Sequence, residues 1–209
     1  MTGIPLVYGK NDAAVMGAAR VAVEAQEKKR ITAKIEYCNG YRNDGTAVAP
    51  ETKGGSGSVS PTYTQISAPI YTHNHPREAG ILGGTFSIGS VHFSRGQKYV
   101  TGDLAVFTET RNRTMRASAK EGTYSITKGP NFDGAGALKY MRKIEAKADK
   151  AHFDRGTALT DRLRRGEITR EQYKAEYARS FNTMLVELHN GFMAGASQYG
   201  YTYTLERRK

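Results

Sequence analysis

Two long helical patterns fill the last third of the chain and constrain its fold more than any other feature. One runs from about Ala137 to Arg165 and the other from Thr169 to about Ser197. Gly166 favours a helix end and Thr169 an N-cap, so the two helices should form a hairpin. The second helix has an apolar stripe at helical spacing, made of Phe181, Met184, Leu185, Leu188 and Phe192. Such a stripe has to pack against another part of the chain.

The preceding residues alternate between helical and strand-like patterns. An alanine-rich segment from about Asp12 to Lys29 ends in basic residues and predicts a helix. The stretches "ITAKIEYC" and "TAVAP" predict a hairpin around residues 43–45, and "APIYTH" predicts a short strand. A short helix near "GDLAVFTETR" precedes a second hairpin, "TMRASA" with "TYSIT". We therefore predict an α/β fold, with α+β as the alternative, in which helices flank a mixed β-sheet.

Glycine, serine and proline mark the segments between these elements. Residues 50–65 read as an insertion loop, and the glycine-rich region 77–102 should be largely loop. The tail "QYGYTYTLERRK" suits an edge strand with one aromatic face. We divide the chain into a core domain, residues 1–134, and a helical C-terminal extension, residues 135–209, that packs on the core.

The chain is strongly basic, which bears on its partners. Its 209 residues include 31 Lys and Arg against 20 Asp and Glu, a formal charge of +11. Nucleic acid is the first anionic partner that such a charge favours. Between residues 139 and 165, nine basic residues stand against four acidic ones, which makes either a solvated helix face or a surface for a phosphate backbone. Aromatic residues are sparse there, so a base-stacking platform is not predicted.

Cysteine content and hydropathy bear on the compartment. Cys38 is the only cysteine, so the chain forms neither an intrachain disulfide nor a cysteine zinc cluster. The first residues lack a basic segment followed by an apolar run, and no run of about eighteen apolar residues occurs. These features predict a cytoplasmic protein with no membrane-spanning segment.

Two histidines stand close together at the end of a predicted strand, in "YTHNHP". Residues two apart on a strand point to the same side, so His73 and His75 can converge on one metal ion while Asn74 faces away. A catalytic zinc needs three protein ligands and an open position for water, and a further carboxylate must accept a proton from that water. The alternative is a hydrogen-bonded polar turn that holds no metal.

The order of several motifs resembles that of the JAMM, or MPN, metalloprotease family. That family has a glutamate on an early strand, His-x-His-Pro at a strand end and Ser-x-x-Asp at a helix start; this chain has "IEY", then "THNHP", then "GGTFS". The resemblance covers about residues 31–126. With "MRASAKEGTYSI" included, it is closest in kind to a JAMM-like group of bacteriophage and mobile-element genes. It implies a JAMM-like mixed sheet and a protein made in a bacterial host cell.

The resemblance implies a role for each matching residue. His73 and His75 would bind zinc, Glu36 would be the general base, and Ser87 would hydrogen-bond the developing oxyanion. Without the resemblance, Glu36 reads as a solvent-facing strand residue and Ser87 as a helix N-cap.

The third ligand is where the sequence departs from the family pattern. Ser90 stands three residues after Ser87, where the family has its aspartate. Asp103, at the start of a predicted helix, is the best replacement if an insertion has moved the aspartate along the chain, and His92 is a weaker candidate. Asp103 could also be only a helix cap. Ser87 and Asp103 would then have to converge through tertiary structure.

Two classes of function follow from these features. The first is a zinc-dependent peptidase or isopeptidase, which would hydrolyse an amide bond of a peptide or protein substrate through a metal-activated water. The second is a phage or mobile-element structural or interaction protein that retains a JAMM-like core without catalysis and binds nucleic acid through its basic helices.

Overall fold

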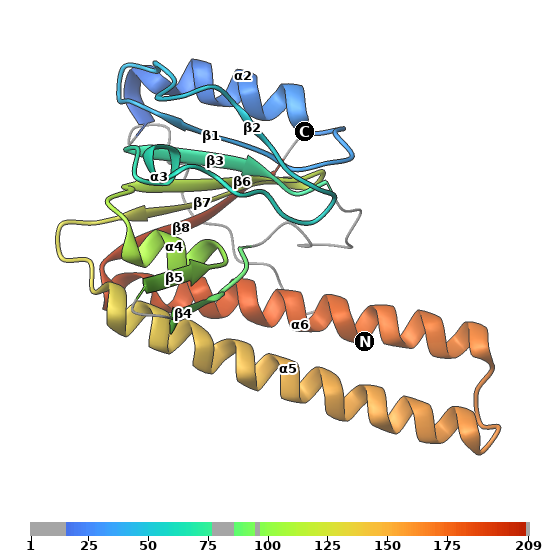
Figure 1. The fold of residues 1–209 in the computed structure, drawn as a ribbon. Helices are drawn as coiled ribbons and strands as arrows, with labels where there is room; N and C mark the ends of the chain where they lie inside the picture. Colours follow the sequence, from blue (N-terminus) through green and yellow to red (C-terminus); the bar gives the residue numbers. More distant parts are fainter. Residues whose placement is uncertain (1–15, 77–85, 95–96, 208–209) are drawn as a thin grey trace.

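A mixed sheet of six strands lies at the centre of the computed structural model, which describes residues 16–76, 86–94 and 97–207 (Figure 1). The strand order is β2-β1-β3-β6-β7-β8. Strands β3 and β6 pair in parallel, and the other neighbours in this sheet are antiparallel. The strands are β1 (Tyr37–Tyr41), β2 (Thr52–Lys53), β3 (Ile70–Asn74), β6 (Thr114–Ser118), β7 (Gly122–Lys128) and β8 (Tyr201–Arg207).

Helices cover both faces of this sheet. On one face α2 (Arg20–Arg30), preceded by the short turn η1 (Gly17–Ala19), packs its buried Val23 with Ile70 of β3. The main core lies on the other face, where the sheet meets α4 (Asp103–Glu109), α5 (Gly134–Arg164) and α6 (Arg170–Tyr199). A single turn, α3 (Tyr63–Ile66), lies against β1. The predicted α/β class, with a mixed sheet flanked by helices, is confirmed at this level.

The long C-terminal helices form the predicted hairpin, and they pack along each other (Figure 1). Thr169 makes a full capping box with Gln172 at the start of α6, and Gly166 in the connection has a φ of +72°. The apolar stripe of α6 is buried from Met184 to Phe192, whereas Phe181 at its outer end is 37% exposed. No helix within the described ranges has a stretch both long and apolar enough to cross a bilayer.

The first predicted hairpin differs from the observed one. The strand begins at Tyr37 and not near residue 31, and its antiparallel neighbours are β2 and β3. The segment "TAVAP" contributes only an isolated bridge between Tyr41 and Ala47. Local alternation indicates a strand in this segment, but it does not indicate the partner strand, because that depends on long-range pairing. Of the first predicted helix, residues 12–15 lie outside the described residues, and the helix ends at Arg30.

The expectation of loop over residues 77–102 is wrong in its second half. Strands β4 (Ser90–Ser94) and β5 (Gln97–Thr101) form a separate antiparallel hairpin, with Ser90 opposite Thr101. Glycine content suggested loop, but the glycines at 89 and 102 lie just outside the paired residues.

The C-terminal tail forms the predicted edge strand. Strand β8 pairs with β7, and Tyr201 and Tyr203 are buried on the face that meets α6. The segment from residue 135 onwards therefore supplies both the long helical hairpin and one strand of the central sheet.

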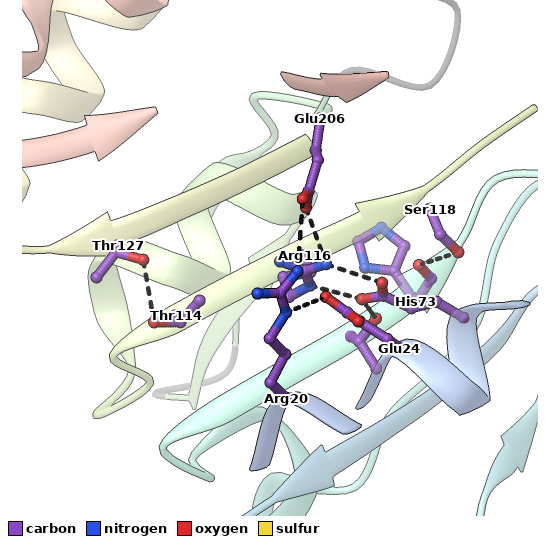
Figure 2. A network of polar contacts seen from close by, with 10 residues as sticks. Arg20, Glu24, His73, Thr114, Arg116, Ser118, Thr127 and Glu206 are labelled. Carbon is purple, nitrogen blue, oxygen red and sulfur yellow. Dashed lines mark hydrogen bonds and ion pairs between the residues drawn. The ribbon is translucent and has the colours of Figure 1, made fainter. Parts of the chain in front are cut away.

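A buried ion pair attaches α2 to the sheet (Figure 2). The Arg116 guanidinium donates to both carboxylate oxygens of Glu27, at 2.7 and 2.9 Å, and the two residues are only 1% and 5% exposed. Thr72 donates a further hydrogen bond of 2.9 Å to Glu27. Glu206 of β8 approaches both Arg116 and Arg20, at 4.0 and 3.9 Å. Side chains from α2, β3, β6 and β8 therefore meet in one polar network on this face.

Candidate metal centre

The end of β3 places both histidines on the face of the sheet that meets α4, α5 and α6. Tyr71 and His73 alternate with Thr72, which faces α2, so the odd-numbered residues point towards the main core. His75 follows directly after the strand, and its backbone N–H donates to the Ser118 carbonyl at 2.8 Å. The Nε2 atoms of His73 and His75 are 2.8 Å apart, as i and i+2 spacing predicts.

Asp103, the first residue of α4, completes a group of three donors. Its Oδ1 lies 3.2 Å from His73 Nε2, and its Oδ2 lies 3.9 Å from His75 Nε2. One ligand atom from each residue can be chosen so that all of them lie within 4.8 Å of one another. His73, His75 and Asp103 therefore form a possible metal-binding triad.

The spacing of the triad fits a single small cation. Donors around a tetrahedral zinc with bonds of about 2.0–2.1 Å lie roughly 3.4 Å apart. The measured separations of 2.8, 3.2 and 3.9 Å lie on both sides of that value. Two imidazoles and a carboxylate also match the ligand types of catalytic zinc sites. The geometry does not identify the ion, because other divalent metals accept the same donors.

Ser87 and Asp103 form a reciprocal capping box although they are far apart in the sequence. The Asp103 backbone N–H donates to Ser87 Oγ at 3.0 Å, and the Ser87 backbone N–H donates to Asp103 Oδ2 at 2.9 Å. The Ser87 hydroxyl also donates to Asp103 Oδ2 at 2.8 Å. In an ordinary capping box these two residues are an N-cap and the third helical residue, three positions apart.

The backbone bonds of α4 continue this helical register back to Ser87. The N–H of Leu104 donates to the Ser87 carbonyl and that of Ala105 to the Ile88 carbonyl, both at 3.0 Å. If residues 90–102 are left out of the count, these are the i+4 to i bonds of an α-helix, and Ser87-Ile88-Gly89-Asp103 reads as Ser-x-x-Asp. The first turn of α4 is thus divided by the inserted β4–β5 hairpin.

Two glycines make the division possible. A Cβ added to Gly102 would lie 2.4 Å from the Gly89 Cα, and one added to Gly89 would lie 1.7 Å from the Thr101 carbonyl oxygen. Both residues also have positive φ angles, +69° for Gly89 and +78° for Gly102. Only glycine permits so close an approach in this conformation. We call this crossing the glycine neck.

Mutual charges fix the protonation of the triad. Burial works against ionisation of Asp103, but His73, His75 and the Ser87 N–H outweigh it and hold the pKa of Asp103 well below its usual range. Burial also works against a charge on His73, yet the Asp103 carboxylate outweighs it and raises the pKa of His73. The short His73–His75 contact needs a proton on one Nε2 atom, and a metal ion bound there would displace that proton.

Glu36 lies beside the triad, one residue before β1. The pairing of Cys38 with His73 places Glu36 opposite His75 if the register continues by two residues. Its backbone is fixed by bonds to 54 and 55, with Glu36 N–H donating to Gly55 O at 2.7 Å. The side chain is only 9% exposed, and its charge is among those that raise the pKa of His73. Glu36 is therefore not the solvent-facing strand residue of the alternative reading.

Two neighbours of the triad were not singled out from the sequence. Tyr71 stacks on His73, with ring centroids 5.6 Å apart, and Cys38 is the strand partner of His73. Burial raises the pKa of the Cys38 thiol to about 11, so it stays protonated. Strand alternation could have indicated Tyr71, two positions before His73, whereas Cys38 follows only from the register between strands.

The remaining candidate residues lie on other elements. Ser90 and His92 belong to β4. His189 is fully buried against Tyr203, and His152 bonds Ser180 Oγ at 2.8 Å, so both have packing or hydrogen-bonding roles away from the triad.

One atom of the triad lacks the support that ligating histidines usually have. His73 Nδ1 is buried and has no hydrogen-bond partner among the described residues. Outer hydrogen bonds ordinarily fix the tautomer of a ligating imidazole. Here stacking on Tyr71 and the packing of Phe86, at a centroid distance of 6.5 Å, orient the ring instead.

Comparisons with family models, curated proteins and solved structures find no match to this chain. The fold and the site together define an α/β-type protein with a possible His-His-Asp metal centre.

Proposed function

We propose that the protein is a zinc-dependent peptidase or isopeptidase of the JAMM type. The observation that carries the proposal is the convergence of His73, His75 and Asp103, with Ser87 reaching Asp103 in a Ser-x-x-Asp helical register that an inserted hairpin interrupts. That arrangement supports the ligand order implied by the motif resemblance. It offers Asp103 as the third ligand in place of the aspartate that the family has three residues after its serine. The chain is the product of a phage or mobile element in this proposal.

Each residue has a distinct part in the proposed reaction. His73, His75 and Asp103 would hold the ion, and zinc when bound supplies a water that loses its proton near neutral pH. Glu36 accepts that proton and passes it to the leaving amine, because it is a buried carboxylate near His73 that is not in the ligand group. Glu27, which is also buried near His73, is instead held by Arg116. Ser87 donates its single hydroxyl proton to Asp103 in the structure. To stabilise an oxyanion it has to turn that proton towards the substrate.

Metal content of the purified full chain tests the site. About one zinc per chain is expected after loading and dialysis, and none in a His73→Ala, His75→Ala variant. His152→Ala is the matched control, because His152 lies on α5 and should not change the stoichiometry. Absence of bound zinc in the folded wild-type chain would refute the metal proposal.

Hydrolysis is tested separately from metal binding. Glu36→Gln should keep zinc but lose cleavage of a quenched-fluorescence peptide library and of an isopeptide-linked lysine reporter, since it removes only the proton acceptor. Asp103→Asn should lose both zinc and cleavage. Cleavage that survives in Glu36→Gln would remove Glu36 from the mechanism. Zinc binding without cleavage of either probe by the wild type would count against hydrolysis of these substrate classes.

A second candidate function, an interaction protein, is favoured by the outer part of the α5–α6 hairpin. Phe153 is 73% exposed and Tyr177 is 42% exposed. Both line a pocket, together with Asp149, Asp161 and Arg164. Aromatic side chains with charges of both signs suit self-pairing about a two-fold axis. Sedimentation velocity should then show a dimer that Phe153→Ser and Tyr177→Ser weaken. A concentration-independent monomer would refute self-pairing.

Nucleic-acid binding through the basic helices is less favoured. Five of the nine basic residues between 139 and 165 make ion pairs: Lys150, Arg155, Arg162, Arg164 and Arg165. Paired cations release fewer counterions on binding a phosphate backbone. An affinity for duplex DNA that falls steeply with added salt would instead support nucleic-acid binding as the function.

A further inference from the structure

A second pocket lies at the end of the sheet opposite the triad. It has a volume of about 570 Å³ and is lined by residues 111–113 before β6, residues 127–130 at the end of β7 and Thr202 at the start of β8. The triad is instead at the C-terminal end of β3. Because β3 and β6 run parallel, the two sites are separated by about the length of a strand, roughly 13 Å for five residues.

The charge of this pocket is entirely positive among the described residues that line it. Arg111 and Arg113 are exposed, and Lys128 is half-buried. No ion pair joins any of these three cations to a carboxylate in the described part of the chain.

Lys128 is held in place by contacts other than an ion pair in the described part of the chain. Its Nζ donates to the Thr110 carbonyl at 2.6 Å and lies 4.8 and 5.3 Å from the ring centroids of Phe107 and Phe132. Burial lowers the pKa of Lys128 to about 8, and the charge of Glu109 opposes this only in part. Because no carboxylate is among the described residues that line the pocket, an anion there would add negative charge beside the three cations.

Asn112 provides an independent indication of a ligand. The residue lines the pocket and is 0% exposed, yet neither its Oδ1 nor its Nδ2 has a hydrogen-bond partner among the described residues. The nearby Thr110 Oγ1 is likewise buried without a partner. Leaving such a group without a partner is unfavourable, and buried polar groups without partners are rare. Both Asn112 atoms are closed to solvent, so the side chain has to turn towards the three cations to meet a polar ligand in the pocket.

We propose that this pocket binds a phosphate group carried by a molecule of nucleotide size. Two arginines suit the bidentate recognition of phosphate, and a lysine and a neutral amide add further donors. The volume exceeds that of inorganic phosphate and lies within the range of small-molecule sites. Phosphate borne by a mononucleotide and phosphate in a nucleic-acid strand share this chemistry, and the experiment separates these sources. The site does not depend on metal binding or hydrolysis at the triad.

Calorimetric titration of the full chain tests the proposal, with sodium phosphate, adenosine monophosphate and a twelve-residue oligodeoxythymidylate as probes. The test variant is Arg111→Gln, Arg113→Gln, and the control is Arg170→Gln, Lys174→Gln, which removes the same charge from exposed positions on α6. Adenosine monophosphate should bind the wild type and the control within two-fold of each other. The test variant should bind it at least ten-fold more weakly.

The same series separates the sources and can overturn the proposal. If the oligonucleotide binds more tightly than the mononucleotide and only the test variant weakens it, the pocket holds strand phosphates. Equal weakening by both variants would mean that charge alone, and not this pocket, attracts the probes. No binding of phosphate or mononucleotide at millimolar concentration would also overturn the proposal. The side-chain amide signal of Asn112 in a ¹⁵N correlation spectrum should shift on titration, and a signal that stays fixed would exclude Asn112 from the site.

Discussion

Removal of the inserted hairpin should leave the metal site intact. It should also bring Ser87 and Asp103 into a contiguous Ser-x-x-Asp motif. In a variant lacking residues 90–102, Gly89 would precede Asp103 directly, and Ser87 and Asp103 would be three positions apart. The bonds from Leu104 to Ser87 and from Ala105 to Ile88 then become ordinary bonds of one helix. Gly89 can change its φ from +69° to a helical value without steric cost, because it has no Cβ.

The expected gain in stability can be estimated from the loop that is removed. Closing a segment of this length costs about 2 kcal/mol by the logarithmic loop-entropy relation. Deletion also removes half-buried Val100, which packs on the main core, a loss of about 1 kcal/mol. The net change in the free energy of unfolding is a gain of about 1 kcal/mol, which corresponds to a rise in Tm of about 2–4 °C for a chain of this size.

A second deletion, of residues 90–101 only, is the matched control. It retains Gly102, so Asp103 is four positions from Ser87 and is rotated by about 100° around the helix. Zinc stoichiometry by mass spectrometry and Tm by calorimetry should show binding in the longer deletion and a marked loss in the shorter one. If both variants fold but bind zinc equally, or if the longer deletion loses zinc, the interrupted-helix interpretation is wrong.

Three further outcomes are expected. Ser87→Ala should lower zinc affinity about 10- to 100-fold, as loss of an outer hydrogen bond to a ligand does, and Ser87→Thr should restore most of it; competition with a fluorescent chelator measures this. Glu27→Gln should lower the free energy of unfolding by about 3–5 kcal/mol in urea titration, because it leaves the buried Arg116 charge without its partner, and a loss below 1 kcal/mol would contradict that role. Without metal, the lowered pKa of Asp103 contributes stability that is present above about pH 4 and is lost as the pH falls. The raised pKa of His73 contributes stability that is present below about pH 6.5 and is lost as the pH rises. The Tm difference between wild type and Asp103→Asn in chelator should therefore be largest between these values, and a constant difference would refute the coupling.

The sequence predicts those parts of the structure that local patterns determine. The long helices follow from helical spacing and from Gly166 and Thr169 at their junction. His73 and His75 converge because residues two apart on a strand share a side. The helix start at Asp103 also follows from local pattern, whereas its choice as third ligand follows from the motif resemblance and its approach to His73 from tertiary structure. The helix boundaries and the histidine pair needed only a few neighbouring residues.

Long-range pairing determines what the sequence did not reveal. Glycine content over residues 77–102 predicts loop, whereas the pairing of β4 with β5 depends on the residues between the glycines. The motif resemblance implies Glu36 as the general base, but its place beside the triad depends on the pairing of β1 with β3. The burial of Asn112 without a hydrogen-bond partner among the described residues likewise depends on the assembly of β6, β7 and β8.

The glycine neck makes the distance along the chain between Ser87 and Asp103 a free variable. Whatever replaces residues 90–101 enters and leaves the helix at nearly the same point, so its length and sequence can change while the ligand positions do not. Proteins built in this way would share a site without sharing a fixed motif spacing. A motif search that permits a gap of any length between Ser-x-Gly and Gly-Asp would recover them, where one that requires Ser-x-x-Asp passes them over.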